Sequence, residues 1–286
     1  MKSHRAYTSA PRRNARQSYP LLTRRQLIFL AAGAAGLIAG GGVACSAINP
    51  WKNPVEASTE PESASQTIKL AEPPSDTPAV TSDSSLPWTL RLVNKEHRLD
   101  KQFAPPSQSE LPAGRWSSSE RSFTFDSRAF DDLVAMLKAA EQDGVKPFVC
   151  STYRTYDYQK NLYEKRVART TSETGLQGEA AEEEAAFWVA PPGASEHQTG
   201  LAADIVDATY TNLDEAQEGT EAQHWLMDHC HEYGFILRYP TDKSSITGIG
   251  YEPWHYRYVG REFASDIALS GLCLEEWIAQ AYQPSA

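Results

Sequence analysis

The stretch SEHQTGLAADIVD, residues 195–207, combines metal-binding residue types with the pattern of a buried strand. LAADIV is apolar apart from Asp204, and His197 lies in the loop before it, since Gly200 would break a helix. A buried carboxylate is normally paired or bound to a metal, because an unpaired charge is costly among apolar residues. One nitrogen and one oxygen near a strand end suit zinc. The alternative is a buried Asp–His pair without a metal.

The stretch YEPWHYRYV, further along the chain, contains the other groups that a catalytic zinc site needs. His255 is expected on a strand, and with His197 and Asp204 it gives two histidines and one carboxylate, which leaves zinc a fourth position for water. Glu252 precedes a proline and is therefore biased to an extended conformation. A carboxylate that is not a ligand can act as the general base for that water. The alternative is that Glu252 only forms an ion pair with Arg257.

Arg154, in STYRTYDYQ, is expected where a strand ends and a helix begins. A guanidinium fixed there can bind a substrate carboxylate or stabilise a developing oxyanion. The alternative is a surface arginine on a turn. Three other histidines share one expected helix at spacings that do not share a face, and we expect them at the surface or core edge: His224, His229 and His231.

Hydrophobic periodicity predicts the elements that position these residues. An amphipathic helix is expected over 126–144, with Asp126 and Ser127 as N-cap candidates and Gly144 at its end. The insertion 170–190 is expected to present a solvated acidic helical face. The other expected elements are helices over 157–168, 221–234 and 274–282, strands over 145–153, 201–206 and 235–239, and two extended segments around a turn in 246–260. This order predicts an α+β domain with a small, mostly antiparallel sheet flanked by helices.

The N-terminal part differs in composition from the rest of the chain. Residues 1–26 are basic and contain no acid, and residues 27–44 carry no charge. This pattern predicts a cytoplasmic N-terminus, a transmembrane or export-signal segment at 27–44, and export of the remainder of the chain. TRRQLIFLAAG resembles a twin-arginine signal, and Cys45 stands where a lipoprotein would be cleaved, so a retained anchor, a cleaved signal and a lipid anchor remain alternatives.

Residues 45–88 are rich in Pro, Ser, Thr and Glu, and we expect them to form a disordered linker before a folded domain over 89–286. The formal net charge of the 286-residue chain is -10. With no basic stripe in the folded part, this charge argues against a nucleic acid as the main partner. Outside the cell, a disulfide among Cys150, Cys230 and Cys273 is permitted, and spacing does not choose the pair. None lies in a CxxC pair, so cysteine-bound zinc is not expected.

Taken together and in this order, STYRTYDYQ, SEHQTGLAADIVD, GFILRYP and YEPWHYRYVG resemble the VanY-type D-alanyl-D-alanine carboxypeptidases over about residues 90 to 280. The resemblance implies one zinc ion per domain. The family's zinc ligands fall on His197, Asp204 and His255. Its general base falls on Glu252, and its substrate- or intermediate-binding arginine falls on Arg154. The resemblance also implies that Ser195 and Gln159 line the substrate end of the site. The insertion at 170–190 is longer than the family pattern.

The implied activity is removal of the C-terminal D-alanine from peptidoglycan stem peptides by a zinc-activated water. A dipeptidase or an L,D-carboxypeptidase of the same fold is an alternative, as is a non-catalytic peptidoglycan-binding module. We expect a monomer whose catalytic domain lies outside the cytoplasm at the bacterial cell membrane. The expected partners are the stem peptide and, through the N-terminal segment, the membrane.

Overall fold

The computed structural model of the protein describes residues 86–281. These residues form an α+β domain with two small antiparallel sheets and flanking helices, which confirms the predicted fold class. The elements are, in chain order, η1 (Trp88–Leu90), β1 (Gln108–Glu110), β2 (Thr124–Asp126), α2 (Phe130–Gln142), β3 (Pro147–Ser151), α3 (Tyr156–Thr174), α4 (Glu179–Ala186), η2 (Glu196–Thr199), β4 (Ala202–Asp207), η3 (Glu215–Gly219), α5 (Glu221–His229), η4 (Cys230–Tyr233), β5 (Phe235–Tyr239), α6 (Ser244–Thr247), β6 (Glu252–Tyr258), α7 (Arg261–Ser270) and α8 (Leu274–Ala281).

The larger sheet has the strand order β3-β4-β6-β5, and all neighbouring strands are antiparallel. β4 and β6 are its two central strands, and every residue of β4 is buried. Their register pairs Asp204 with His255 and Ala202 with Arg257. Because directly opposite residues of antiparallel strands project to the same face, this register puts the predicted metal-binding side chains together.

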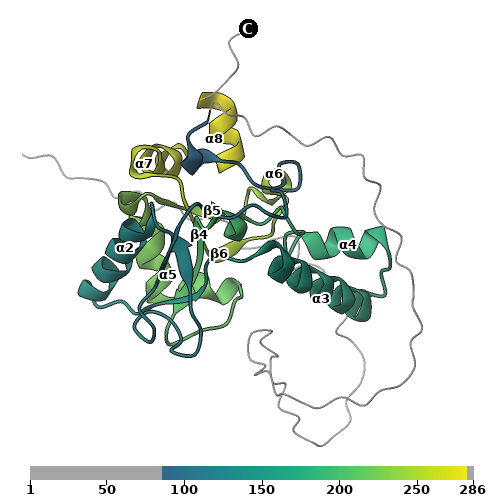
Figure 1. Ribbon diagram of the computed structural model, residues 1–286, viewed down its shortest axis with the longest axis horizontal. Helices are drawn as coiled ribbons and strands as arrows, with labels where there is room; N and C mark the ends of the chain where they lie inside the picture. The colour runs from purple at the N-terminus through teal and green to yellow at the C-terminus, as the bar shows by residue number, and fades with distance from the viewer. Residues whose placement is uncertain (1–85, 282–286) are drawn as a thin grey trace, which may run out of the picture. The chain divides into compact units, whose positions relative to one another are not determined.

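Two apolar clusters hold the domain together. The larger one joins the sheet to α2 and α5 and includes Leu133, Leu137, Ile205 and Tyr256, all fully buried. The smaller cluster joins η1 and β5 to α7 and α8. Figure 1 shows α7 and α8 together at one end of the strands and α2 and α5 beside them. The face that carries Asp204 lies opposite the larger cluster, since neighbouring residues of β4 alternate between the two faces.

Two of the sequence-based element predictions are wrong in detail. The first helix, α2, begins at Phe130 and not at Asp126 or Ser127, and Ala129 is its N-cap. Asp126 instead ends β2, where its carboxylate accepts a hydrogen bond from the Arg128 N–H at 2.9 Å and pairs with the Arg128 guanidinium at 2.6 Å. An aspartate that binds the backbone two residues ahead forms a turn, which competes with capping a helix.

The region predicted as two extended segments contains only one strand. Its first part forms α6, which ends at Gly248 with φ of 73°, and β6 follows as the single strand. The helix α7 was not among the predicted elements. Its buried side chains, Ala264 and Ile267, pack in the smaller apolar cluster.

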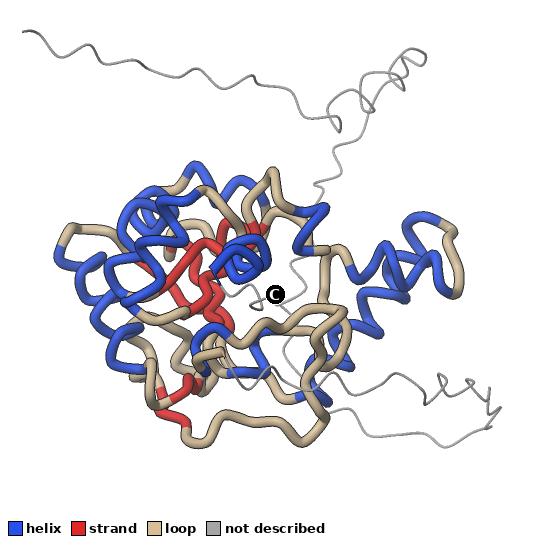
Figure 2. The backbone as a smooth tube through the Cα atoms, turned by 90° about the horizontal axis from the view of Figure 1, so that it is seen from above, coloured by secondary structure: helices blue, strands red, loops and turns tan. Residues whose placement is uncertain are grey.

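The insertion at 170–190 contains the end of α3 and all of α4, and the two helices form a hairpin. α3 starts after Thr155, whose side chain accepts a hydrogen bond from the Tyr158 N–H, and ends at Gly175 with φ of 77°. Ala181 and Ala185 are the buried side of α4, and the glutamates between them are exposed, as expected for a solvated acidic face. Figures 1 and 2 show the hairpin projecting from the side of the sheet-containing body.

Within residues 86–281, no helix combines the length and apolar character needed to span a membrane. The basic segment 1–26, the apolar segment 27–44 and all but the end of the predicted linker 45–88 lie outside the described residues. The three cysteines considered for a disulfide are free thiols in separate parts of the described fold: Cys150 in β3, Cys230 in η4 and Cys273 between α7 and α8.

Candidate functional site

The loop that carries His197 is fixed by its backbone. η2 ends at Gly200, whose φ is 72°, and a Cβ there would lie 3.0 Å from Pro105 Cγ, so the position favours glycine. His197 Nδ1 lies 2.6 Å from the Thr152 carbonyl oxygen. That oxygen only accepts, so Nδ1 carries the proton and Nε2 presents its lone pair to Asp204.

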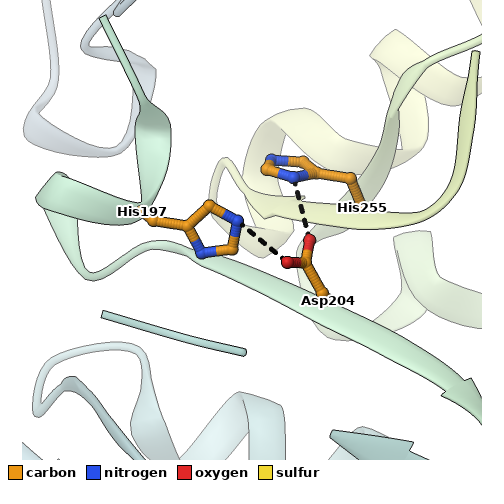
Figure 3. Close-up of side chains that lie close together, drawn as sticks. All are labelled: His197, Asp204 and His255. Carbon is orange, nitrogen blue, oxygen red and sulfur yellow. Dashed lines mark hydrogen bonds and ion pairs between the residues drawn. The ribbon is translucent and has the colours of Figure 1, made fainter. Parts of the chain in front are cut away.

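His197, Asp204 and His255 converge on one point, from η2, β4 and β6 (Figure 3). Asp204 Oδ2 lies 3.2 Å from His197 Nε2, and Asp204 Oδ1 lies 3.1 Å from His255 Nδ1. The two imidazole rings are nearly perpendicular, at 88°, with centroids 4.9 Å apart. All three side chains are buried. The structure thus brings together the three residues predicted as metal ligands.

This donor set fits a zinc ion. One ligand atom from each residue can be chosen so that all lie within 4.8 Å of one another. Zinc–nitrogen and zinc–oxygen bonds of about 2.0–2.2 Å place neighbouring tetrahedral ligands about 3.3 Å apart. The two contacts of Asp204 with the histidines, at 3.2 and 3.1 Å, are close to that spacing. Two imidazoles and a carboxylate also match the ligand types of catalytic zinc sites, which keep a fourth position open.

Glu252, the predicted general base, lies at the start of β6 beside this cluster. Its Oε2 is 3.6 Å from His255 Nδ1. Burial and the neighbouring Asp204 carboxylate raise the pKa of Glu252 to about 7, although His255 acts in the opposite direction. Arg257 pairs instead with Glu196, at 2.7 Å, so the alternative of a Glu252–Arg257 ion pair is not what the structure forms. A carboxyl group with a pKa near neutrality can both accept and release a proton.

Arg154 lies against Asp204 and is mostly buried. Its Nη2 donates to Asp204 Oδ2 at 2.6 Å, and its Nε donates to Ser151 Oγ at 2.8 Å. Its Nη1 lies 3.5 Å from Gln159 Oε1, and Gln159 Nε2 donates to the Ala190 carbonyl at 2.8 Å. Gln159 is therefore placed beside Arg154.

Ser195, the other residue implied at the substrate end, is buried at the residue before η2. Its side chain makes no cap hydrogen bond with that helix. The structure thus places Ser195 in the loop of His197.

The site gives its two histidines opposite pKa shifts. Burial and the Arg154 guanidinium lower the pKa of His197 to about 4. Burial also disfavours the charged form of His255, but its hydrogen bonds with Asp204 and Glu196 raise its pKa to about 9. Burial opposes ionisation of Asp204, yet His197 and Arg154 keep its pKa well below its usual range. Asp204 is thus a carboxylate at neutral pH, the form in which it binds metals.

A second group of charged residues, behind His255, was not predicted from the sequence. Glu196 lies between the arginines of β5 and β6, Arg238 and Arg257, and all three side chains are fully buried. The available signal was one arginine in each otherwise apolar or aromatic strand, FILRY and WHYRY, together with an acid next to His197. Buried charges in such positions require partners.

Comparisons with known proteins place these residues in a family context. The family model described as VanY, D-alanyl-D-alanine carboxypeptidase, matches residues 122–261. A D-alanyl-D-alanine carboxypeptidase of Enterococcus faecalis (strain ATCC 700802 / V583) is 41% identical over 192 residues, which are 67% of this chain and 66% of that protein. The chain thus spans about two thirds of that relative.

Solved structures agree in fold. VanYB in complex with D-alanine-D-alanine has a TM-score of 0.59 at 39% identity, over 68% of this chain and 99% of that one. A mutant of the vancomycin-resistance D,D-pentapeptidase VanY in complex with Zn(II) has a TM-score of 0.58 at 38% identity, over 67% and 99% of the two chains. The LD-carboxypeptidase LdcB has a TM-score of 0.58 at 37% identity, over 65% and 84%.

Proposed function

Because the chain belongs to the VanY family of D-alanyl-D-alanine carboxypeptidases, we propose that it removes the C-terminal D-alanine from peptidoglycan stem peptides. The reaction is hydrolysis at a zinc ion held by His197, Asp204 and His255. The observation that carries this proposal is the convergence of these three side chains, with contacts of 3.1 and 3.2 Å, next to a second carboxylate, Glu252, that is not one of them.

In this proposal Glu252 transfers the protons of the reaction, and Arg154 stabilises negative charge. A zinc ion bound at the site supplies Lewis acidity, which polarises a peptide carbonyl and lowers the pKa of water toward about 7. Glu252 accepts the proton of the attacking water on its carboxylate and later delivers it to the leaving amine of D-alanine. Its raised pKa, about 7, suits both steps.

Arg154 supplies fixed positive charge beside the scissile bond. Hydrogen bonds to Asp204 and Ser151 hold its guanidinium in one orientation, so little reorganisation is needed when negative charge develops on the carbonyl oxygen or a peptide carboxylate arrives. The contact with Gln159 supports a positioning role for that residue, and the place of Ser195 next to η2 supports a role in shaping the substrate end.

The first test uses the purified full-length chain and a pentapeptide ending in D-Ala-D-Ala. We expect release of one D-alanine per peptide, loss of activity with a chelator and recovery with zinc, with zinc quantified in the same sample. Hydrolysis of the free dipeptide D-Ala-D-Ala, with the pentapeptide left intact, would favour a dipeptidase. Cleavage restricted to a tetrapeptide ending in an L,D bond would favour the L,D alternative. Absence of bound zinc would refute the proposal.

We also propose that the catalytic domain acts outside the cytoplasm, because stem peptides are assembled into the wall there. The basic, then uncharged N-terminal segment supports this location. Protease digestion of intact spheroplasts should remove the domain if it is external and spare it if it is cytoplasmic.

A further inference from the structure

Glu196 directly precedes His197 in the sequence, but its side chain points to His255, the other histidine predicted to bind the metal. Its side chain is completely buried. One carboxylate oxygen, Oε1, accepts hydrogen bonds from Arg238 Nε at 2.8 Å and Arg257 Nη1 at 2.7 Å. Two charge-assisted bonds to the same oxygen fix the position and the ionised form of this carboxylate.

The second oxygen, Oε2, faces His255. Among the described residues its one polar partner is His255 Nε2, at 3.4 Å. A buried carboxylate oxygen requires a donor, so the proton of a neutral His255 ring belongs on Nε2. The other ring nitrogen, Nδ1, then presents its lone pair toward Asp204, 3.1 Å away. A metal ion bound by both Asp204 and His255 needs this lone pair on Nδ1.

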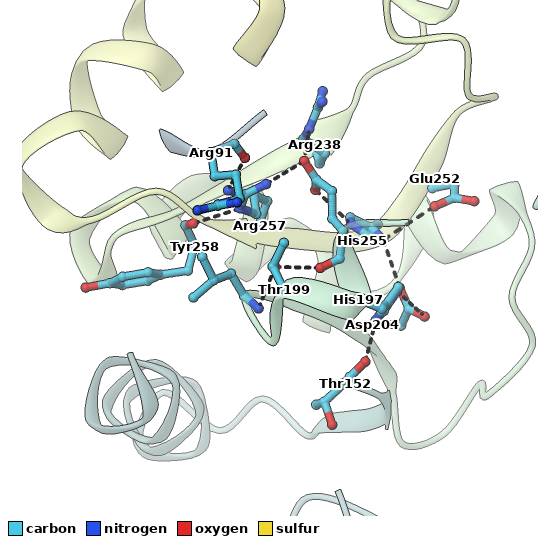
Figure 4. A network of polar contacts seen from close by, with 12 residues as sticks. Arg91, Thr152, His197, Thr199, Asp204, Arg238, Glu252, His255, Arg257 and Tyr258 are labelled. Atoms are coloured by element: carbon cyan, nitrogen blue, oxygen red, sulfur yellow. Dashed lines mark hydrogen bonds and ion pairs between the residues drawn. The ribbon is translucent and has the colours of Figure 1, made fainter. Parts of the chain in front are cut away.

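The two arginines are themselves immobilised. Arg257 Nη2 donates to the carbonyl oxygens of Thr89 and Arg91 at 2.9 and 2.8 Å, and Figure 4 shows Arg257 beside Arg91. Arg238 donates from Nη1 and Nη2 to Glu275 on α8, at 2.9 and 2.6 Å. Both ends of the described chain thus contribute to holding Glu196, which leaves its carboxylate no freedom to turn away from His255.

The two histidines of the cluster are oriented by different acceptors. His197 donates from Nδ1 to a backbone carbonyl, that of Thr152, whereas His255 faces a carboxylate. In metal sites a carboxylate behind a histidine fixes its tautomer and increases its basicity. If Glu196 served only to pair Arg238 and Arg257, its carboxylate would not need the contact with His255 Nε2.

On the basis of the proposed zinc site, we propose that Glu196 is a positioning residue for the metal. It holds the proton of His255 on Nε2, so that the lone pair of Nδ1 remains free to bind the ion. Arg238 and Arg257 act through it by fixing the carboxylate. Glu196 itself does not touch the substrate.

Glu196→Gln in the full-length chain tests this role with almost no change in size. Arginine only donates, so the carbonyl oxygen of the introduced amide should stay with the two arginines, and the amide NH2 group should face His255 Nε2. That NH2 group also only donates, which drives the ring proton to Nδ1. We therefore expect zinc affinity, measured by competition with a chromophoric chelator, to fall about 10- to 100-fold.

Glu275→Gln is the matched control, because it removes a charge from the same arginine cluster without touching His255. It should lower thermal stability and leave zinc affinity within about threefold of the wild type. Nitrogen-15 spectra of the zinc-loaded proteins should show a proton on His255 Nε2 in the wild type and in Glu275→Gln. The same affinity loss in both variants would mean a merely structural role and overturn the inference.

Glu196→Asp provides a second variant if the glutamine variant does not fold. It keeps the negative charge near the arginines and withdraws the carboxylate from His255, so zinc affinity should again fall. Wild-type zinc affinity in either Glu196 variant would overturn this inference alone. A wild-type chain that binds no zinc would instead overturn the proposed function and, with it, the metal that Glu196 is proposed to serve.

Discussion

The two faces of the central sheet are held by different forces. The face that packs on α2 and α5 is apolar, and residues such as Leu137 and Ile205 are fully buried there. The opposite face carries Asp204, His255 and Arg257, and ion pairs and hydrogen bonds join them to their neighbours. Burial of apolar area stabilises a fold, whereas buried charges add little net stability. The apolar clusters therefore maintain the domain, and the charged residues of the opposite face are available for chemistry.

The largest expected effect of a single change is on the charged face, at Glu252. Glu252→Gln keeps the shape of the side chain but removes the proton acceptor, so turnover of the D-Ala-D-Ala peptide should fall about 10²- to 10⁴-fold. Zinc binding should persist, because the three ligands remain. Stability should not fall, since burial raises the pKa of Glu252 to about 7 and thus already disfavours its charged form.

The exposed Glu183→Gln on α4 is the control for this variant, and it should leave turnover unchanged. Steady-state kinetics and zinc content are measured on the same preparations. A Glu252→Gln enzyme with near-normal turnover would show that another group accepts the proton. One that has lost its zinc would show that Glu252 belongs to the ligand set.

The matching change on the apolar face is Leu137→Ala. Leu137 is fully buried on α2, so the deletion should lower the free energy of unfolding by about 2–5 kcal/mol. Zinc affinity and turnover per folded molecule should stay close to the wild type, because no site residue contacts are removed. Leu269→Ala is the same chemical change at a residue that is 83% exposed, and it should cost almost nothing. Urea unfolding measures both; equal costs would contradict the assigned core.

A smaller effect tests a polar contact inside the apolar face. The Tyr256 hydroxyl donates to Gln223 Oε1 at 2.7 Å, and Gln223 Nε2 donates to the Ile205 carbonyl at 2.6 Å. Tyr256→Phe should lower the free energy of unfolding by about 1–2 kcal/mol, because it leaves a buried acceptor without its donor. Tyr158→Phe, at an exposed tyrosine, is the control. A large loss of zinc affinity in Tyr256→Phe would show that the two faces are coupled.

The same contrast explains what the sequence could predict. The apolar stripe of α2 follows the periodicity of its burial, and the strand 201–206 is a short, mostly apolar run that is buried along its whole length. Both elements were therefore expected at nearly their observed places. The convergence of His197, Asp204 and His255 followed from motif resemblance, and the β4–β6 register supplies its physical basis. Periodicity depends on apolar burial, and it is therefore informative mainly on the apolar face.

The parts that were missed depend on contacts between distant residues. Glu196 meets Arg238 and Arg257 only after β5 and β6 pair, and no local pattern predicts that meeting. The start of α2 was misplaced because Asp126 satisfies a turn as well as it would satisfy a helix cap. The roles of buried charges thus require the tertiary structure, whereas the outlines of apolar elements do not.

The smallest predicted effect is a pH dependence that arises on the charged face. The folded-state pKa of His255 is about 9, above its ordinary value of 6.5, so the folded protein keeps a proton that the unfolded chain releases. The stability that His255 contributes is complete below pH 6.5 and is lost as the pH rises through 9. Between pH 7 and 8, the zinc-free protein should lose about 1 kcal/mol of unfolding free energy.

The interval between pH 7 and 8 distinguishes the titration of His255 from that of Glu252 and His197. Glu252, with a pKa raised from 4.5 to about 7, lowers stability mainly as the pH rises from 4.5 to 7. His197, with a pKa lowered from 6.5 to about 4, costs stability as the pH falls below 6.5. Urea unfolding of chelator-treated protein at pH 7 and 8 measures the slope, and His255→Gln should flatten it. A wild-type protein that is equally stable at both pH values would show that His255 does not hold this proton, and the charged face would then lack its main titrating group.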